Sequence, residues 1–380
     1  VSRTLGKFCA ALGHQGSATV TYRANDHLQL LKPFQRATVD YVFQRLFTDA
    51  APTRQFLVAD EVGLGKTMVA RGVIAKTIEQ LIGKVDRIDV VYICSNQAIA
   101  EQNIKSLNVI GSATKPLNTR LTLLPLEIEL EGGIASRPIN LISLTPGTAL
   151  DLKSSLGTAK ERALIYEMLR KRLGVRHSGV QRIFRGGVTP ENWPGWTDWM
   201  RGQSISKEIS EKFNAAIGDE FILRIREAAE LARHKKSPDY PPHQRPAAII
   251  GELRRILARI CVDALTPDLI ILDEFQRFAE LLHEHDENLA PEKAAAAELA
   301  RALFSYSGPD GSSARLLLLS ATPYRMLTLS SDDPDEGDHY SDFLRTMRFL
   351  FGDVDGEARV TELESELSQF RRALQAMPAS

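Results

Sequence analysis

The sequence predicts an α/β fold with a mostly parallel sheet and a helical insertion. Five short apolar runs are continuous rather than alternating, which is typical of strands buried on both faces of a sheet. A helical pattern separates the first two runs, and such strand–helix alternation indicates a doubly wound core. The runs cover residues 56–59, 90–94, 139–142, 269–272 and 316–319.

The spacing of apolar residues predicts the elements between these runs. From Met68 to Ile82, apolar side chains recur on one face of a helix. Residues 121–126 form a weaker strand candidate. The strand–helix alternation then stops until about residue 262, and helices with loops replace it. The other expected helices cover residues 158–173, 205–235, 341–351 and 361–376.

These patterns divide the 380 residues into one large α/β lobe with additions. The net charge of −1 hides two opposite regions. Residues 153–260 carry 21 basic and 12 acidic side chains, and residues 331–368 carry 3 basic and 12 acidic ones. The parts are an N-terminal extension (1–27), the first part of the lobe (28–150), a basic helical insertion (151–262), the second part of the lobe (263–330) and an acidic helical tail (331–380).

Composition excludes several classes of protein. Hydrophobic residues make up 43% and charged residues 25%, which argues against a disordered, collagen-like or membrane-embedded chain. No run approaches the about 18 apolar residues of a membrane helix. The three cysteines are far apart and predict neither a disulfide framework nor a zinc pair, so we expect a reducing, cytoplasmic compartment. Cys94 and Cys261 lie in apolar runs and are expected in the core.

A glycine-rich segment, Asp-Glu-Val-Gly-Leu-Gly-Lys-Thr at residues 60–67, lies between the first predicted strand and helix. Backbone N–H groups in such a turn point at phosphate oxygens, and the helix N-terminus adds its dipole. Lys66 would reach the β- and γ-phosphates, and the Thr67 hydroxyl would bind Mg²⁺. The strict pattern has glycine where Asp60 stands, so the alternative is an ordinary surface turn. The candidate ATP-binding residues here are Gly63, Leu64, Gly65, Lys66 and Thr67.

A pair of carboxylates, Asp273 and Glu274, directly follows the fourth apolar run. A carboxylate at the end of a buried strand can hold Mg²⁺, and its neighbour can orient the attacking water in phosphoryl transfer. The alternative is a charged helix start. The candidate catalytic residues are therefore Lys66, Asp273 and Glu274, with Thr67 and Asp273 as metal ligands.

Polar or glycine-rich segments follow all five predicted strands. Ligands of open α/β sheets bind outside the carboxyl ends of the strands, so we expect these segments to form one site at one edge. They cover residues 60–67, 95–97, 145–148, 273–276 and 320–322.

The order of residues 60–67, Asp273-Glu274 and Ser-Ala-Thr at 320–322 resembles motifs I, II and III of superfamily 2 helicases and translocases. The form of the first segment is similar to the Swi/Snf-like branch. The resemblance implies a RecA-like P-loop NTPase lobe that binds ATP and Mg²⁺. It also implies that ATP hydrolysis drives movement on nucleic acid, with DNA expected more than RNA.

The same resemblance implies further roles. Leu-Lys-Pro-Phe-Gln at residues 31–35 resembles the adenine-reading segment of the branch, which implies that Gln35 contacts the base. Residues 95–96 and 145–148 resemble motifs Ia and Ib, which touch the nucleic-acid backbone in the family. Asp-Glu-Phe-Gln departs from the commoner DEAD and DEAH forms, which leaves the role of Gln276 open. The implied nucleic-acid residues are Ser95, Asn96 and Thr145, and the implied coupling residues are Gln276, Ser320 and Thr322.

The family's motor needs a second lobe, which supplies arginine fingers. Only 58 residues follow Thr322, too few for a second RecA-like lobe, so we expect that lobe to be missing from this chain and hydrolysis by this chain alone to be weak. An absent arginine finger costs about 10³–10⁵ in rate. Residues 145–148, 161–162 and 274–278 are also similar to large bacterial helicase-related proteins, some of them associated with defence against phage.

Several alternatives stay open. All three tryptophans lie at residues 193–199, where they would stack bases, form a strand-separating wedge, or pack the insertion onto the core as a lid, which we favour. The basic insertion would track a phosphate backbone or present ordinary solvated helix faces. The whole chain would alternatively be a non-enzymatic, ATP-dependent switch or scaffold for a protein partner. The Asp273-Glu274 pair favours the enzyme, because a switch needs no water-activating carboxylate.

Overall fold

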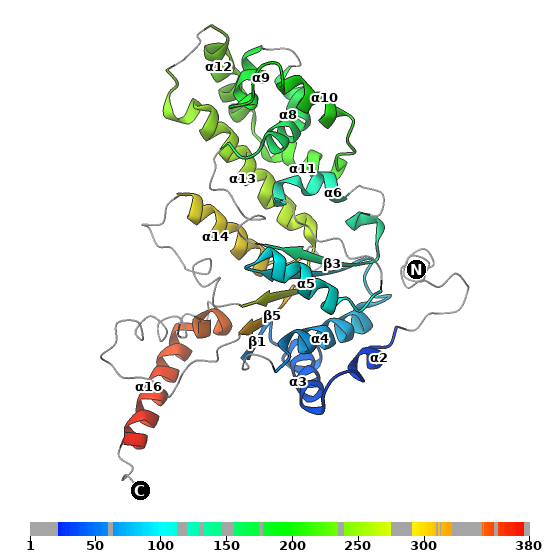
Figure 1. Cartoon of the computed structure of the whole chain (residues 1–380). Coiled ribbons are helices and arrows are strands. Elements are labelled where there is room, and N and C mark those ends of the chain that lie inside the picture. The colour runs from blue at the N-terminus through cyan, green and yellow to red at the C-terminus, as the bar shows by residue number, and fades with distance from the viewer. Residues whose placement is uncertain are drawn as a thin grey trace, which may run out of the picture.

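The computed structural model shows an α/β protein, with a sheet in the middle and a large helical region beyond one of its faces (Figure 1). The structure describes residues 22–59, 64–111, 120–128, 133–145, 156–174, 178–234, 239–274, 291–308, 311, 313–320, 344, 346–352 and 356–375.

The described sheet has five strands, all parallel, in the order β1-β5-β4-β2-β3. This confirms the predicted parallel sheet and the five apolar runs. Every residue of β2 and β3 is buried, as is typical of strands covered on both faces. The strands are β1 (Gln55–Ala59), β2 (Ile88–Cys94), β3 (Ile139–Leu144), β4 (Leu269–Asp273) and β5 (Arg315–Ser320).

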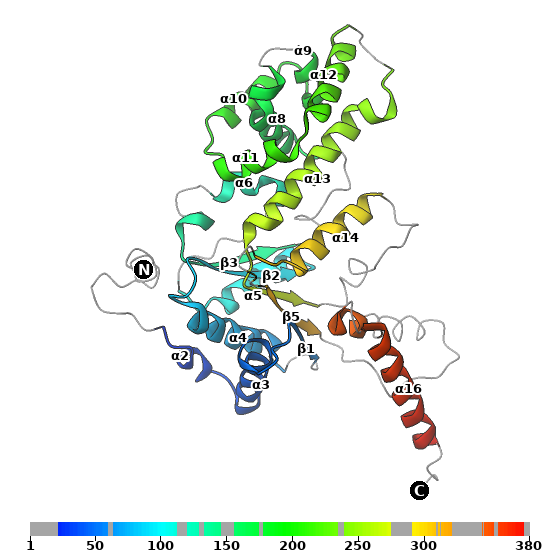
Figure 2. The same cartoon turned by 180° about the vertical axis from the view of Figure 1, so that it is seen from behind.

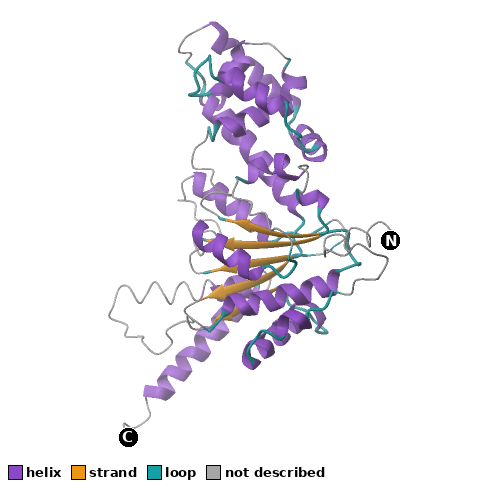
Figure 3. Ribbon diagram, turned by 45° about the vertical axis from the view of Figure 1, so that its right-hand side comes forward, coloured by secondary structure: helices purple, strands orange, loops and turns teal. Residues whose placement is uncertain are grey.

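Helices cover both faces of the sheet (Figure 3). The chain crosses the sheet in one direction from β1 to β3 and returns through β4 to β5. Because crossovers between parallel strands are right-handed, the reversal places the two sets of helices on opposite faces. One face carries α2 (Asn25–Leu28), α3 (Pro33–Phe43), α4 (Lys66–Leu81) and α5 (Gln97–Leu107), and the other carries α13 (Pro246–Leu265) and α14 (Pro291–Phe304).

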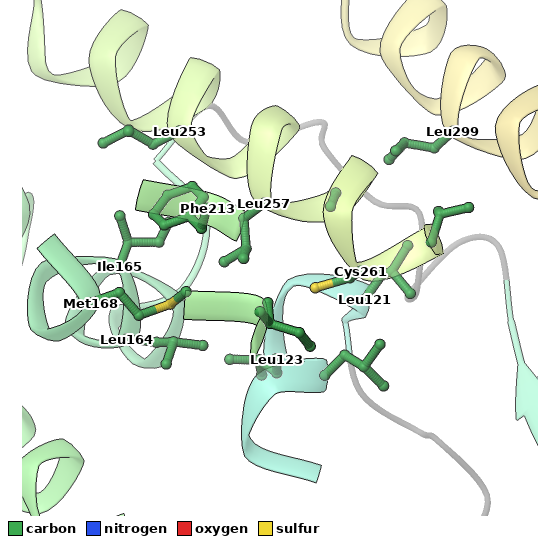
Figure 4. Packing of buried hydrophobic residues seen from close by; sticks show 14 of the residues in the cluster. Leu121, Leu123, Leu164, Ile165, Met168, Phe213, Leu253, Leu257, Cys261 and Leu299 are labelled. Carbon is green, nitrogen blue, oxygen red and sulfur yellow. The ribbon is translucent and has the colours of Figure 1, made fainter. Parts of the chain in front are cut away.

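The long helix α13 joins the sheet to the helical region (Figure 2). Its 20 residues span about 30 Å at 1.5 Å per residue. Leu253, Leu257 and Cys261 on this helix pack against the other helices of the region (Figure 4). That region contains α6 (Leu124–Ile128), α8 (Ala159–Leu173), α9 (Ser178–Arg185), α10 (Trp193–Arg201), α11 (Lys207–Ala216) and α12 (Asp219–His234).

The predicted strand over residues 121–126 is wrong. This segment is a 3₁₀ turn, Leu121–Leu123, followed by the short helix α6. A short apolar run fits a buried helix as well as a strand, and Pro125 cannot donate to a strand ladder. The segment packs with the helical region, and the backbone N–H of Ser206 donates to the Pro125 carbonyl at 2.9 Å.

The expected helices are otherwise confirmed, with small differences. The helical stretch over 205–235 is two helices, α11 and α12, which part at Ile217 and Gly218. In the tail, α16 (Gly356–Gln375) begins five residues before its predicted start, and residues 346–351 are helical. Cys94 and Cys261 are buried free thiols, as expected of core residues.

Candidate functional site

The carboxyl ends of the five strands lie along one edge of the sheet. In the parallel register Ala59 pairs with Ser320, and Cys94 pairs with Asp273. The polar residues that follow these strands are therefore brought to one edge, as the sequence predicts. Of the predicted site residues, Gly63, Gln276 and Thr322 lie outside the described residues.

The helix α4 begins at this edge, and no side chain among the described residues caps its start. Its N-cap is Gly65, whose φ of 87° lies in the left-handed region that favours glycine. By contrast, Asn96 caps α5 and Thr158 caps α8 through their side chains. A helix start without such a cap leaves first-turn N–H groups to bind an anion such as phosphate. Lys66 and Thr67, both half-buried, are the first two residues of the helix.

The side chain of Gln35 forms hydrogen bonds that hold the turn before α4 in place. Its side chain is buried, its Oε1 accepts the backbone N–H of Lys32 at 3.0 Å, and its Nε2 donates to the Leu64 carbonyl at 2.9 Å. A Cβ atom on Gly65 would lie 2.3 Å from that Nε2. Gln35 therefore locks the N-terminus of α3 to the loop before α4.

Asp273 is the last residue of β4 and points toward the face that carries α4. Side chains alternate along a strand, and Leu269 and Ile271 belong to the core on the α4 face. Asp273 Oδ2 accepts hydrogen bonds from the Tyr92 hydroxyl and from Asn103 Nδ2, the latter at 3.2 Å. The half-buried carboxylate thus lies on the same face as the start of α4.

Glu274 adopts a backbone conformation that is uncommon for its residue type. Its φ is 54°, in the left-handed region, and its N–H donates to Asp273 Oδ1 at 3.0 Å. Its Oε2 accepts a hydrogen bond from the Ser95 hydroxyl at 3.1 Å. The two candidate catalytic carboxylates therefore adjoin each other and the end of β2.

The three candidate nucleic-acid residues lie at the ends of β2 and β3. Ser95 binds Glu274, whereas Asn96 Oδ1 accepts the N–H groups of Ala98 and Ile99 at 2.9 and 3.3 Å and so caps α5. Thr145 follows β3 and is half-buried. Ser320 ends β5 and is buried, with its side chain toward the face opposite Asp273.

Many charges of the helical region are structural. Burial would raise the pKa of Glu161, but Arg254, the Thr158 N–H, the Thr122 hydroxyl and Arg120 together hold it below its usual value. Arg254 is itself buried and contacts Glu161 at 2.9 Å. The net positive charge of this region is therefore not all available to an external partner.

The buried Arg162 and half-buried Arg172 are likewise used inside the region. Arg162 donates to four backbone carbonyls, those of Leu156, Gly157, Phe184 and Arg185. Arg172 donates to the carbonyls of Asn214 and Ile217, where α11 ends.

Two of the three tryptophans do not pack as a lid over the α/β core. Trp193 is 2% exposed and packs edge-on to Tyr166 within the helical region. Trp196 and Trp199 are 37% and 43% exposed, at a 6.3 Å centroid separation from each other. Lys160 lies over the Trp199 ring at 5.4 Å. The favoured lid interpretation is therefore wrong for the two exposed indoles.

Sequence reasoning missed Tyr92 and Asn103. Tyr92 lies in a buried, mostly apolar strand, where a phenol hydroxyl needs a partner. Asn103 is a polar residue beside the buried Ala100, Ile104 and Leu107 of α5. A polar residue in apolar surroundings was therefore the feature of the sequence that could have pointed to Tyr92 and Asn103.

The described residues hold no group of three or more His, Cys, Asp or Glu side chains fit to bind a metal ion. That finding is compatible with Mg²⁺, which one or two carboxylates and substrate phosphates hold in proteins. In the part of the chain that the structure covers, no helix has the length and apolar character to cross a membrane. Neither family models, curated proteins nor solved structures give a match to this chain.

Proposed function

We propose that this chain is the first ATP-binding lobe of a superfamily 2 helicase or translocase, a RecA-like P-loop lobe of the Swi/Snf-like branch. It would couple ATP hydrolysis to movement on nucleic acid, together with a second lobe. Its place would be the cytoplasm.

One observation carries this proposal. The start of α4 and Asp273 share one edge and one face of the sheet, and Glu274 follows Asp273 directly, with only β5 between β1 and β4. At about 4.8 Å per strand, β1 and β4 lie about 10 Å apart. That separation suits a phosphate chain and a cation held between the two groups.

The residues present fit both ATP and Mg²⁺. The first-turn N–H groups of α4 and the Lys66 ammonium would bind phosphate oxygens. The Thr67 hydroxyl and the Asp273 carboxylate are oxygen donors, the ligand type that Mg²⁺ prefers. The cation would supply neutralisation of charge on the transferred phosphoryl group, and Glu274 would orient the attacking water.

The first test is nucleotide binding. A fluorescent ATP analogue with Mg²⁺ should bind the wild type, and Lys66→Ala should weaken that binding at least about tenfold, because a charge-assisted contact is worth about 1.5–3 kcal/mol. Lys76→Ala is the matched control, since Lys76 lies on the same helix but pairs with Asp40. Equal loss in both variants would contradict the proposed phosphate site.

The second test separates an enzyme from a switch. With the second lobe and DNA present, the wild type should turn over ATP, and Glu274→Gln should abolish turnover while ATP still binds. Robust binding without any turnover under those conditions would favour the non-enzymatic switch. Affinity for DNA that does not fall with salt would argue against a contact with the phosphate backbone.

A further inference from the structure

Three side chains form a closed set of hydrogen bonds at the edge of the sheet. The Tyr92 hydroxyl donates to Asp273 Oδ2 and accepts from Asn103 Nδ2 at 2.9 Å. Asn103 Nδ2 also donates to the same Asp273 oxygen at 3.2 Å. The three residues come from β2, α5 and β4, so the set joins two strands and a helix.

The chemistry of each group fixes the direction of these bonds. The Tyr92 side chain carries an O–H donor that faces a carboxylate oxygen, so the hydroxyl donates to Asp273 Oδ2. An ionised carboxylate only accepts hydrogen bonds, so the amide of Asn103 must present its NH₂ group to it. Both donors therefore point at the same oxygen of the Asp273 carboxylate.

The two oxygens of Asp273 have different surroundings. Within the part of the chain that the structure describes, Oδ2 accepts from two side chains, whereas Oδ1 accepts from the Glu274 backbone N–H. Carboxylate oxygens have two lone-pair sites each, so Oδ1 keeps capacity for a cation. Tyr92 is 1% exposed, so its ring cannot move away without opening the core.

We propose that Tyr92 and Asn103 are positioning residues that orient the Asp273 carboxylate for Mg²⁺. The inference rests on the proposed function, and it adds two residues from β2 and α5 to the site. Outer partners of this kind fix the orientation and charge of a metal ligand.

The test is the Mg²⁺ dependence of nucleotide binding in the full chain, read with a fluorescent ATP analogue. Tyr92→Phe deletes only the hydroxyl, and Asn103→Ala deletes the amide at a half-buried helix position. Each should raise the Mg²⁺ concentration at half-saturation about 10–100-fold, as loss of such partners does at metal sites. Binding in EDTA, without a cation, should stay unchanged.

Tyr166→Phe is the matched control, because Tyr166 is also a buried tyrosine but lies in the helical region against Phe184 and Trp193. It should leave the Mg²⁺ dependence as in the wild type. If Tyr92→Phe fails to fold, the Mg²⁺ dependence of nucleotide binding by Asn103→Ala still tests the positioning role.

The possible results distinguish the positioning role of Tyr92 and Asn103 from the proposed ATP-binding function. If Asp273→Asn shifts the Mg²⁺ dependence while Tyr92→Phe and Asn103→Ala do not, the positioning role is overturned and the proposed function stands. Equal loss of binding with Mg²⁺ and in EDTA would also overturn it, since that is a structural effect. If the wild type binds no nucleotide, the proposed function and the inference fall together.

Discussion

Gly65 is the position where a single methyl group tests the local structure of the candidate site most directly. We predict that Gly65→Ala destabilises the protein more than Gly83→Ala. Both glycines flank α4 and both have positive φ, 87° and 77°. A Cβ on Gly83 meets nothing within 4 Å, whereas a Cβ on Gly65 meets Gln35 Nε2 at 2.3 Å.

The magnitudes follow from these contacts. An alanine in the left-handed region costs about 1–2 kcal/mol, which is the whole expected effect at Gly83. At Gly65 the amide of Gln35 must also move and give up its bonds to Leu64 and Lys32. Those bonds are worth about 1 kcal/mol each, so Gly65→Ala should cost about 3–4 kcal/mol in total.

Urea unfolding followed by far-UV circular dichroism measures these free energies. Gln35→Ala makes the decisive background, because it removes the amide that the new methyl group would strike. In that background Gly65→Ala should cost no more than Gly83→Ala, a coupling of about 2 kcal/mol. Equal costs at the two glycines, or additive costs for Gly65→Ala and Gln35→Ala, would refute the reasoning.

Three further predictions concern the rest of the molecule. Trp193→Ala should cost about 3–5 kcal/mol because the indole is buried, and Trp199→Ala less than about 1 kcal/mol, as thermal unfolding of both variants will show. Glu161→Ala removes the carboxylate that forms an ion pair with the buried Arg254 and should cost about 3–5 kcal/mol. The double variant with Arg254→Met should lose less than the sum of the single changes, with tryptophan fluorescence as the probe because all three indoles lie in the helical region. Burial raises the pKa of Asp89 to about 6, above its unfolded value, so the contribution of Asp89 to stability should fall by about 1–3 kcal/mol as pH rises from about 4 to 7. Asp89→Asn should flatten this slope in urea titrations, and an unchanged slope would count against the assignment.

The five strands and α4 were predictable because their signals are local. A strand buried on both faces is mostly apolar, and residues 88–94 and 139–144 are all buried. The common edge of the site followed as well, since parallel strands end on the same side of a sheet. The strand predicted over residues 121–126 was wrong because an apolar run indicates only that a segment is buried. In the structure this segment is buried in the helical region as a 3₁₀ turn and a short helix.

The sequence by itself determined which groups stand at the edge of the sheet: the glycine turn before α4, and Asp273 with Glu274 after β4. Only the tertiary structure decided how those groups are held. Tyr92 and Asn103 lie 181 and 170 residues from Asp273 along the chain, and they reach its carboxylate because β2 pairs with β4 and α5 packs beside β2. Strand order and helix packing depend on the whole core, so no local pattern could show that contact.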